Sequence, residues 1–194
     1  MSKVTSSKDL LMLLLYAKGH AGQQAEPVRG RTRLMKMVFL FDKEVRGKFN
    51  LDKVIPKKAL PDFSPYDFGP FSSRVFSDLE FLVELGFVDQ RPAGDTEPLL
   101  EESIEYEYWQ AAGGQSDGRP SLAREEEFAL TKLGRQFVEG GRAGVLSDNQ
   151  WKTLDDFKAR CTGTPLRSLL RYVYAKYPQM ATASTIRSEI LADR

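Results

Sequence analysis

The stretch PDFSPYDFGPFSSRVFSDLEFLVELGF, residues 61–87, places a loop of prolines and aromatic residues directly before a helical apolar pattern. Each proline biases its predecessor toward an extended conformation and removes a backbone donor. Tyr66 and Phe68 carry large apolar surfaces, and Gly69 permits backbone conformations that other residues resist. We therefore predict that this loop packs across the helix that precedes it and fixes the start of the helix at 72–85. An exposed recognition loop is the alternative.

The helix at 72–85 is predicted from the spacing of its apolar residues. They recur at intervals of three and four and form one wide face: Val75, Phe76, Leu79, Leu82, Val83 and Leu85. Ser72 or Ser73 is placed to cap the helix, and Gly86 to end it. A short strand at Phe87–Val88 should follow.

Two further strands are predicted after this helix. Residues 103–110 (SIEYEYWQ) alternate apolar and charged types with a period of two, and residues 124–131 (REEEFALT) are predicted to pair with them. Thr131 then caps a helix through Val138, which the glycines at 140 and 141 should stop.

Helices are expected at both ends of the chain. An apolar helix at 8–18, capped by Ser7, should be buried. A loop at 19–30 precedes a helix capped by Thr32, whose apolar stripe is predicted to leave Arg33 and Lys36 on a basic flank.

The C-terminal part is predicted to be helical after Ser147, with a second helix opened by Pro165 and ended by Pro178. In that second helix a stripe of Leu166, Leu169, Leu170, Val173 and Tyr177 points to core packing, with a dimer surface as the alternative. A short last helix is expected at 184–191.

Composition places the chain among soluble globular proteins, because 41% of its 194 residues are hydrophobic and 28% are charged. Cys161 and His20 are each the only residue of their type, so neither an internal disulfide nor a Cys/His metal site is expected. No cofactor is implied. The apolar run at 10–17 is shorter than a membrane span requires, and a cytoplasmic protein without membrane attachment is expected.

The net charge of +1 conceals a strong division along the chain. Residues 1–60 carry 13 Lys/Arg against 5 Asp/Glu, residues 61–127 carry 4 against 16, and residues 128–194 carry 11 against 6. Such a separation creates local fields that serve a partner, a dimer or an internal interface. All three readings stay open at this point.

The order of the predicted elements is similar to the winged-helix pattern of bacterial regulators. In that family a helix with the motif LxxLxxxG precedes a two-stranded wing and a helix that begins LTxxGR. The matching residues here are Leu79, Leu82, Gly86, Leu130, Thr131, Gly134 and Arg135. This likeness covers about a third of the chain.

A more specific resemblance covers nearly the whole chain. The segments GRTRLMKMVFLFDKE (30–44), PYDFGPFSSRVFSDLEFL (65–82), FALTKLGRQF (128–137) and LLRYVYAKYPQM (169–180) resemble YwgA-type proteins and the related SocA-like, or Panacea, antitoxin domains. The chain departs from that pattern by having YDFGP where a shorter YGP loop is usual. The resemblance implies an antitoxin-like regulator, by fold-level analogy alone.

Acidic residues disfavour DNA reading by the helix at 72–85 and favour a protein partner instead. Arg74 on this helix is outnumbered by Asp78, Glu80 and Glu84, and a duplex would be repelled. An acidic surface could instead occupy a basic cleft on a protein. The predicted partner-binding residues are Tyr66, Asp67, Phe68, Arg74, Asp78, Glu105, Glu107 and Glu125. A solvated acidic hairpin is the alternative.

The basic cluster Arg29, Arg31, Arg33 and Lys36 is the candidate site for nucleic acid or another anion, because it lies at a helix start. The alternative is a basic face that is solvated or paired with the acidic third of the chain. The lone His20 leaves histidine-dependent nucleophilic catalysis without a plausible base. Adjacent carboxylates such as Glu101–Glu102 point apart, so no enzyme activity is expected.

Taken together, the sequence predicts a mostly helical α+β protein. A winged-helix-like body should cover residues 1–142, with a small β-hairpin, and a C-terminal helical extension over 143–194 should pack on it. The expected function is regulatory or antitoxin-like binding of a protein, in a toxin–antitoxin or phage-defence module. Nucleic-acid binding through residues 29–36 is the second choice, and a homodimer stays open.

Overall fold

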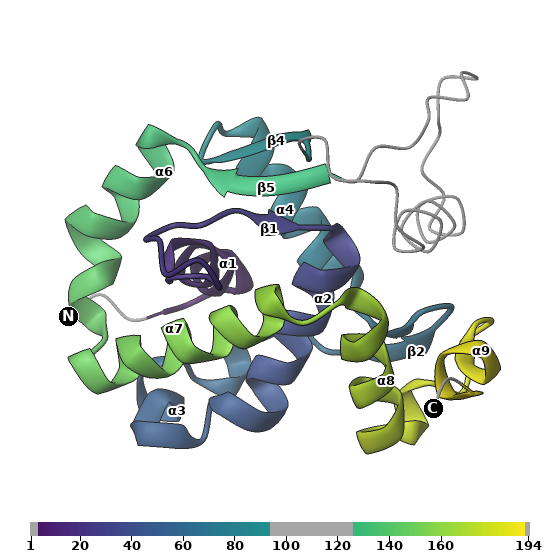
Figure 1. Cartoon of the computed structure of the whole chain (residues 1–194). Coiled ribbons are helices and arrows are strands. Elements are labelled where there is room, and N and C mark those ends of the chain that lie inside the picture. Colours follow the sequence, from purple (N-terminus) through teal and green to yellow (C-terminus); the bar gives the residue numbers. More distant parts are fainter. Residues whose placement is uncertain (1–3, 94–125, 193–194) are drawn as a thin grey trace.

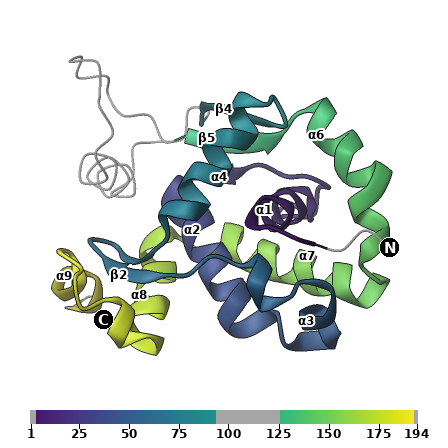
Figure 2. The same ribbon diagram turned by 180° about the vertical axis from the view of Figure 1, so that it is seen from behind.

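The apolar helix α1 (Ser7–Tyr16) lies at the centre of the fold in the computed structural model, which describes residues 4–93 and 126–192. Both views show α1 nearly end-on, surrounded by α2, α4, α6 and α7 (Figures 1 and 2). Every side chain from Leu10 to Leu15 is buried. A helix that is apolar on all sides must be covered on all sides, and each such side chain contributes about 1.5–3 kcal/mol when it leaves water. The prediction of a buried N-terminal helix is confirmed.

The start of α1 is fixed by a capping box at Ser6, one residue before the predicted cap. The carboxylate of Asp9 accepts the backbone N–H of Ser6 at 3.2 Å, and the Ser6 hydroxyl accepts the backbone N–H of Asp9 at 3.4 Å. The prediction of Ser7 as the cap is wrong because the Ser7 hydroxyl donates to Asp78 on α4 instead.

The end of α1 is capped by a residue from far along the chain. The ammonium of Lys158, on α7 (Asp148–Gly163), donates to the carbonyls of Leu15, Ala17 and Glu26 at 2.8, 2.9 and 2.6 Å. The last carbonyls of a helix lack partners within the helix. A buried lysine supplies those partners here.

Helix α2 (Arg31–Leu40) is also buried on every side, and its end passes into a π-helical segment at Phe41–Val45. The helix starts after Gly30, whose φ of 80° is a backbone conformation that favours glycine. Thr32 lies inside the helix and does not cap it, so that prediction is wrong. The predicted solvent-facing basic flank is also absent, because Arg31, Arg33 and Lys36 are buried.

A three-stranded antiparallel sheet has the order β1–β5–β4. The strands are β1 (Val28–Arg29), β4 (Val88–Pro92) and β5 (Glu126–Leu130). Val88 pairs with Leu130 and Val28 with Phe128. The strands predicted near residues 88 and 124–131 are present, whereas β1 was expected to be loop. The predicted strand at 103–110 lies outside the described residues.

The loop of the opening stretch forms a hairpin of β2 (Ser64–Tyr66) and β3 (Gly69–Phe71). Helix α4 (Ser73–Glu84) follows it directly. Phe68 is buried, and the ammonium of Lys36 on α2 donates to the carbonyl of Pro70 at 3.0 Å. The hairpin therefore packs across α2 and precedes α4, as the sequence predicts.

Gly69 is required where the hairpin meets the C-terminal helices. Its φ is 86°, and a Cβ at this position would lie 2.6 Å from the ring of Tyr174. Tyr174 is buried in α8 (Leu166–Lys176), and the Ser184 hydroxyl donates to its phenol oxygen at 3.0 Å. Only glycine fits both the backbone conformation and this close approach.

After α4 the chain turns at Gly86, whose φ is 71°, and the order helix, strand, strand, helix is completed by α6 (Lys132–Phe137). The Thr131 hydroxyl caps α6 by accepting the backbone N–H of Gly134 at 3.1 Å. The glycines at 140 and 141 do not stop this helix. It continues as a π-helical segment at Val138–Arg142 and a 3₁₀ turn at Ala143–Val145.

The remaining short elements are 3₁₀ turns at Lys48–Asn50, Lys57–Ala59 and Pro178–Met180, helix α3 (Leu51–Val54) and helix α9 (Arg187–Ala192). Ser147 caps α7, as predicted, and Gln150 completes a capping box with it. One hydrophobic core cluster includes residues from both sides of the predicted boundary at 142/143, from Val4 to Ile190. The protein is an α+β fold that is mostly helical.

Candidate protein-binding surface

Three of the four residues of the predicted anion-binding cluster lie inside the fold. Arg31 contacts Glu126 at 3.2 Å and Glu80 at 3.5 Å, and donates to the Gln90 side chain at 3.0 Å. Its guanidinium also lies over the rings of Phe76 and Phe128. This arginine joins α2 to the sheet and to α4.

Arg33 and Lys36 have backbone carbonyls as partners. One Arg33 nitrogen donates to the carbonyl of Cys161 at 2.6 Å and to that of Thr164, at the end of α7. Lys36 is fully buried and reaches Pro70. Long basic side chains can pass through a core when their heads reach acceptors at its edge. Arg29 alone of this cluster is exposed. The geometry does not favour nucleic-acid binding by this cluster.

Several acidic residues of α4 and the sheet lie beside basic ones. Glu80 and Glu126 both contact Arg31, and Glu127 contacts Arg91. This arrangement matches the alternative in which part of the acidic third faces the basic N-terminal third. The predicted residues Glu105, Glu107 and Glu125 lie outside the described residues.

The predicted hairpin residues pack within the hairpin and against the C-terminal segment. Tyr66 stacks on Phe71 with ring centroids 4.9 Å apart, and Phe68 is buried. The carbonyl of Asp67 accepts the backbone N–H of Thr185 at 3.1 Å. The hairpin thus has an internal packing role on this side.

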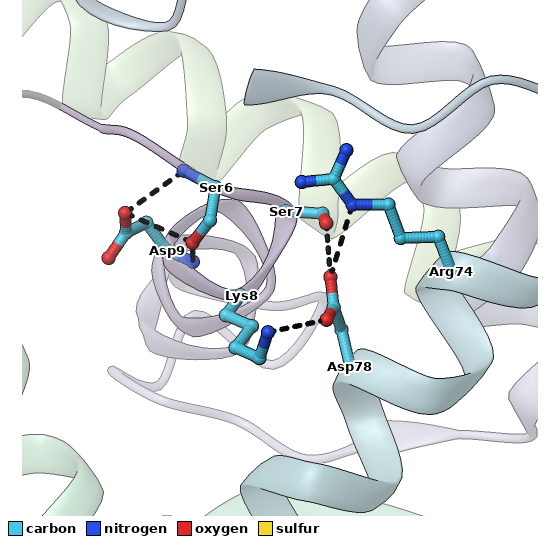
Figure 3. Close-up of polar contacts among 6 residues, drawn as sticks. All are labelled: Ser6, Ser7, Lys8, Asp9, Arg74 and Asp78. Atoms are coloured by element: carbon cyan, nitrogen blue, oxygen red, sulfur yellow. Dashed lines mark hydrogen bonds and ion pairs between the residues drawn. The ribbon is translucent and has the colours of Figure 1, made fainter. Parts of the chain in front are cut away.

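Arg74 and Asp78, by contrast, lie at a polar junction between α4 and the first turn of α1 (Figure 3). Asp78 accepts the Ser7 hydroxyl, and its carboxylate contacts the Lys8 ammonium at 2.8 Å and the Arg74 guanidinium at 3.9 Å. Figure 3 shows these three donors approaching one carboxylate from two helices. The junction fixes the position of α4 against α1.

Next to this junction is a hollow of about 210 Å³ between α1, α4 and α6, which we call the α1/α4/α6 groove. Its apolar lining is Met12, Phe81, Leu82, Leu85, Phe87 and Phe137. Its charged lining is Lys8, Asp9 and Arg142. The rings of Phe87 and Phe137 are 5.1 Å apart, which joins the strand end to α6.

The groove combines exposed apolar side chains with cations. Phe81, Leu85 and Phe137 are 43%, 49% and 42% exposed. The Lys8 ammonium lies 4.9 Å from the centre of the Phe81 ring, and the Arg142 guanidinium lies 5.4 Å from that of Phe137. Arg142 also contacts Asp9 at 3.0 Å. Apolar clusters of this kind, rimmed by charges, are typical of interaction sites.

A second polar cluster joins the π-helical segment after α2 to α8. Glu44 accepts the hydroxyls of Tyr172 and Tyr177 at 2.9 Å each and contacts Lys176 at 3.1 Å. Burial raises the pKa of Glu44, but the hydrogen bonds from Lys176, Tyr177 and Tyr172 outweigh it and lower the pKa. A carboxylate held ionised in this way is a poor general acid.

Metal ligands and a reactive thiol are not found in the part of the chain that the structure describes. Within residues 4–93 and 126–192 no group of three or more His, Cys, Asp or Glu is placed to hold a metal ion. Burial raises the pKa of the free thiol of Cys161 to about 12. A thiol of this kind is not a nucleophile at neutral pH.

Sequence reasoning found Arg74 and Asp78, which lie at the junction beside the groove, but it predicted no binding role for the residues that line the groove. Of these, Lys8 comes from α1, and Phe137 and Arg142 come from the helix that follows the sheet. A local signal existed for Phe81 only. It lies four residues before Leu85, on a second apolar stripe beside the buried stripe of α4.

Comparisons of the chain with protein families, with curated proteins and with solved structures found no match. No helix among the described residues is long and apolar enough to cross a bilayer. We therefore infer function from the geometry of the groove.

Proposed function

We propose that this chain is a regulatory protein that acts by binding another protein through the α1/α4/α6 groove. The observation that carries the proposal is the grouping of the exposed residues Phe81, Leu85 and Phe137 around one hollow. Single exposed apolar residues are common, but a group that shares one hollow marks a surface that a partner covers.

The size of the groove favours protein side chains over a small molecule. Its volume of about 210 Å³ is below the ~300–1,000 Å³ that small-molecule pockets usually have. Phe81 of α4 and Phe137 of α6 both line it and are both partly exposed to solvent. Aromatic residues of this kind often dominate the energy of protein interfaces.

The family resemblance supports the regulatory part of the proposal. The chain resembles YwgA-type and SocA-like proteins in its quoted motifs, and among the described residues α4, β4, β5 and α6 follow one another in the order that the winged-helix resemblance leads us to expect. We extend the proposal accordingly to an antitoxin-like member of a toxin–antitoxin or phage-defence module, working in the cytoplasm. Its partner would then be the product of a neighbouring gene.

A non-catalytic role is supported by the state of the reactive groups. The Cys161 thiol is buried, and the Glu44 carboxylate is held ionised by its donors. The side chain of His20 lies against Gly163 in an exposed loop, where it lines a hollow with Asp148, Asp155 and Asp156.

Copurification tests this function directly. The chain is coexpressed with the product of each neighbouring gene, and complexes are detected by size-exclusion chromatography with light scattering. A double variant, Phe81→Ser with Leu85→Ser, should weaken the complex by tenfold or more, since ~1.4 kcal/mol is tenfold in affinity.

Leu191→Ser is the matched control, because Leu191 is similarly exposed at 40% but lies on α9, on the other side of the molecule from α6 (Figure 1). Thermal melts of all variants check that the fold is kept. A complex that the double variant leaves unchanged would show that the groove is not the binding surface. No complex with any neighbour would contradict the function.

A further inference from the structure

We propose that the segment occupying the groove is an amphipathic helix whose apolar side is flanked by Asp and Glu residues. This inference rests on the proposed function and adds the chemistry of the partner. It is carried by the charge that the groove presents to solvent and by the spacing of its apolar side chains.

The charges around the groove are arranged with the carboxylates beneath and the cations outside. The Asp78 and Asp9 side chains are only 9% and 8% exposed. Their partners Lys8, Arg74 and Arg142 are 38%, 51% and 22% exposed. An approaching molecule therefore meets positive groups first, and the three cations outnumber the two carboxylates.

The two carboxylates are also held by other donors. Asp78 accepts the Ser7 hydroxyl in addition to its two cations. Asp9 accepts the backbone N–H groups of Thr5 and Ser6 at 2.9 and 3.2 Å. An ammonium has three donors and a guanidinium has five, so the cations keep donors for acceptors on a partner. Carboxylates are the protein groups that match them best.

The cations and the apolar side chains lie close enough for one segment to meet both. Arg74, Asp78, Phe81 and Leu85 follow one another at intervals of three and four along α4, so they lie on one face of that helix. Phe81 and Leu85 are one turn apart, about 6 Å along the axis at 1.5 Å per residue. This spacing matches the i and i+4 side chains of a helix laid in a groove.

A second copy of the chain is a poorer occupant. A two-fold contact brings the same patch of both copies together, so the cations Lys8, Arg74 and Arg142 of one copy would face those of the other. Like charges at an interface oppose association. A helix with acidic flanks avoids this repulsion.

Three designed helical peptides test the inference. They share one stripe of Leu and Phe at i, i+3, i+4 and i+7, and their flanking positions are all Glu, all Gln or all Lys. Binding to the full chain is followed by fluorescence anisotropy at low and high salt. The Glu peptide should bind about tenfold more tightly than the Gln peptide, and the Lys peptide most weakly. High salt should reduce these differences.

Two variants separate the contributions of charge and apolar surface. Arg74→Gln should weaken the Glu peptide about threefold and leave the Gln peptide unchanged. Lys152→Gln is the control, because Lys152 is 72% exposed in an ion pair on α7 and does not line the groove. Phe81→Ser with Leu85→Ser should weaken all three peptides.

Each outcome bears on the inference. Equal binding of the three peptides would overturn the inference that the bound helix has acidic flanks. The proposed function would still be supported if the complex with a neighbouring gene product were lost on Phe81→Ser with Leu85→Ser. Failure of every peptide to bind would overturn the inference that the groove binds a helix. Vesicles of phosphatidylcholine with phosphatidylserine form a further arm. If the chain sediments with these vesicles and the Phe81→Ser and Leu85→Ser variant does not, the groove binds a membrane surface and the inferred helix is wrong.

Discussion

The basic side chains of α2 are buried away from water, whereas those around the groove face it. Arg33 and Lys36 have neutral backbone carbonyls as partners, and their charged groups lie inside the fold. Lys8 and Arg74 share the buried carboxylate of Asp78, and their own side chains face solvent. Where the charged group of a basic residue lies in the folded protein thus decides whether its charge serves the fold or a surface. Counting basic residues along the sequence does not distinguish the two.

The largest effect should come from removing a buried cation of α2. Arg33→Met deletes the donors for the carbonyls of Cys161 and Thr164 at the end of α7. A buried carbonyl left without a partner costs about 1–3 kcal/mol, so the free energy of unfolding should fall by about 2–5 kcal/mol. Urea denaturation measures the change. A loss below about 1 kcal/mol would mean that water replaces the guanidinium, and the contrast between the regions would fail.

A second prediction concerns the pH dependence of stability that a buried lysine should cause. Burial lowers the pKa of Lys158 from 10.5 to about 7 in the folded protein. Between these values the unfolded chain binds more protons than the folded one, so this lysine makes the free energy of unfolding rise with pH. Relative to Lys158→Met, the wild-type chain should gain about 1–3 kcal/mol between pH 6.5 and 9.5.

Urea denaturation of both proteins across that pH range checks this prediction, because the other titrating groups are shared and cancel in the difference. A flat difference would mean that the three carbonyls around Lys158 keep its ammonium charged throughout. Lys158 would then be a permanent buried charge and not a titrating one.

The smallest effect on folding is expected at the groove. Arg74 is half exposed, and Asp78 keeps Ser7 and Lys8 when Arg74 is removed. Arg74→Gln should therefore change the free energy of unfolding by less than about 0.5 kcal/mol. Thermal and urea denaturation measure it beside Arg33→Met. A loss similar to that of Arg33→Met would make Arg74 a structural residue and remove the distinction between the two regions.

Local signals predicted much of the fold. The Thr131 cap, the Ser147 capping box and the turn at Gly86 each depend on a few adjacent residues, and all three are present. The packing of the hairpin across α2 was also predicted, because prolines and aromatic residues left few alternatives.

Long-range contacts explain the errors. Strand β1 has only two residues, and its pairing with β5 defines it more than its own sequence does. The basic residues of α2 fit a solvent-facing flank by periodicity, yet their acceptors lie on α7 and β3. The sequence predicted Arg74 and Asp78 of the junction beside the groove, but not the charged lining of the groove itself, because Lys8 and Arg142 reach it through tertiary packing. No periodic pattern in the sequence encodes the approach of these two residues in the folded protein.

The cap that Lys158 places on α1 affects how the chain can fold during synthesis. The lysine lies 143 residues after Leu15, whose carbonyl it binds. During synthesis α1 therefore leaves the ribosome well before the lysine that binds the carbonyls at its end. Nascent chains that contain α1 but not yet Lys158 would carry this apolar helix without its cap, a state that favours chaperone binding and aggregation. Non-local closure of this kind also slows folding.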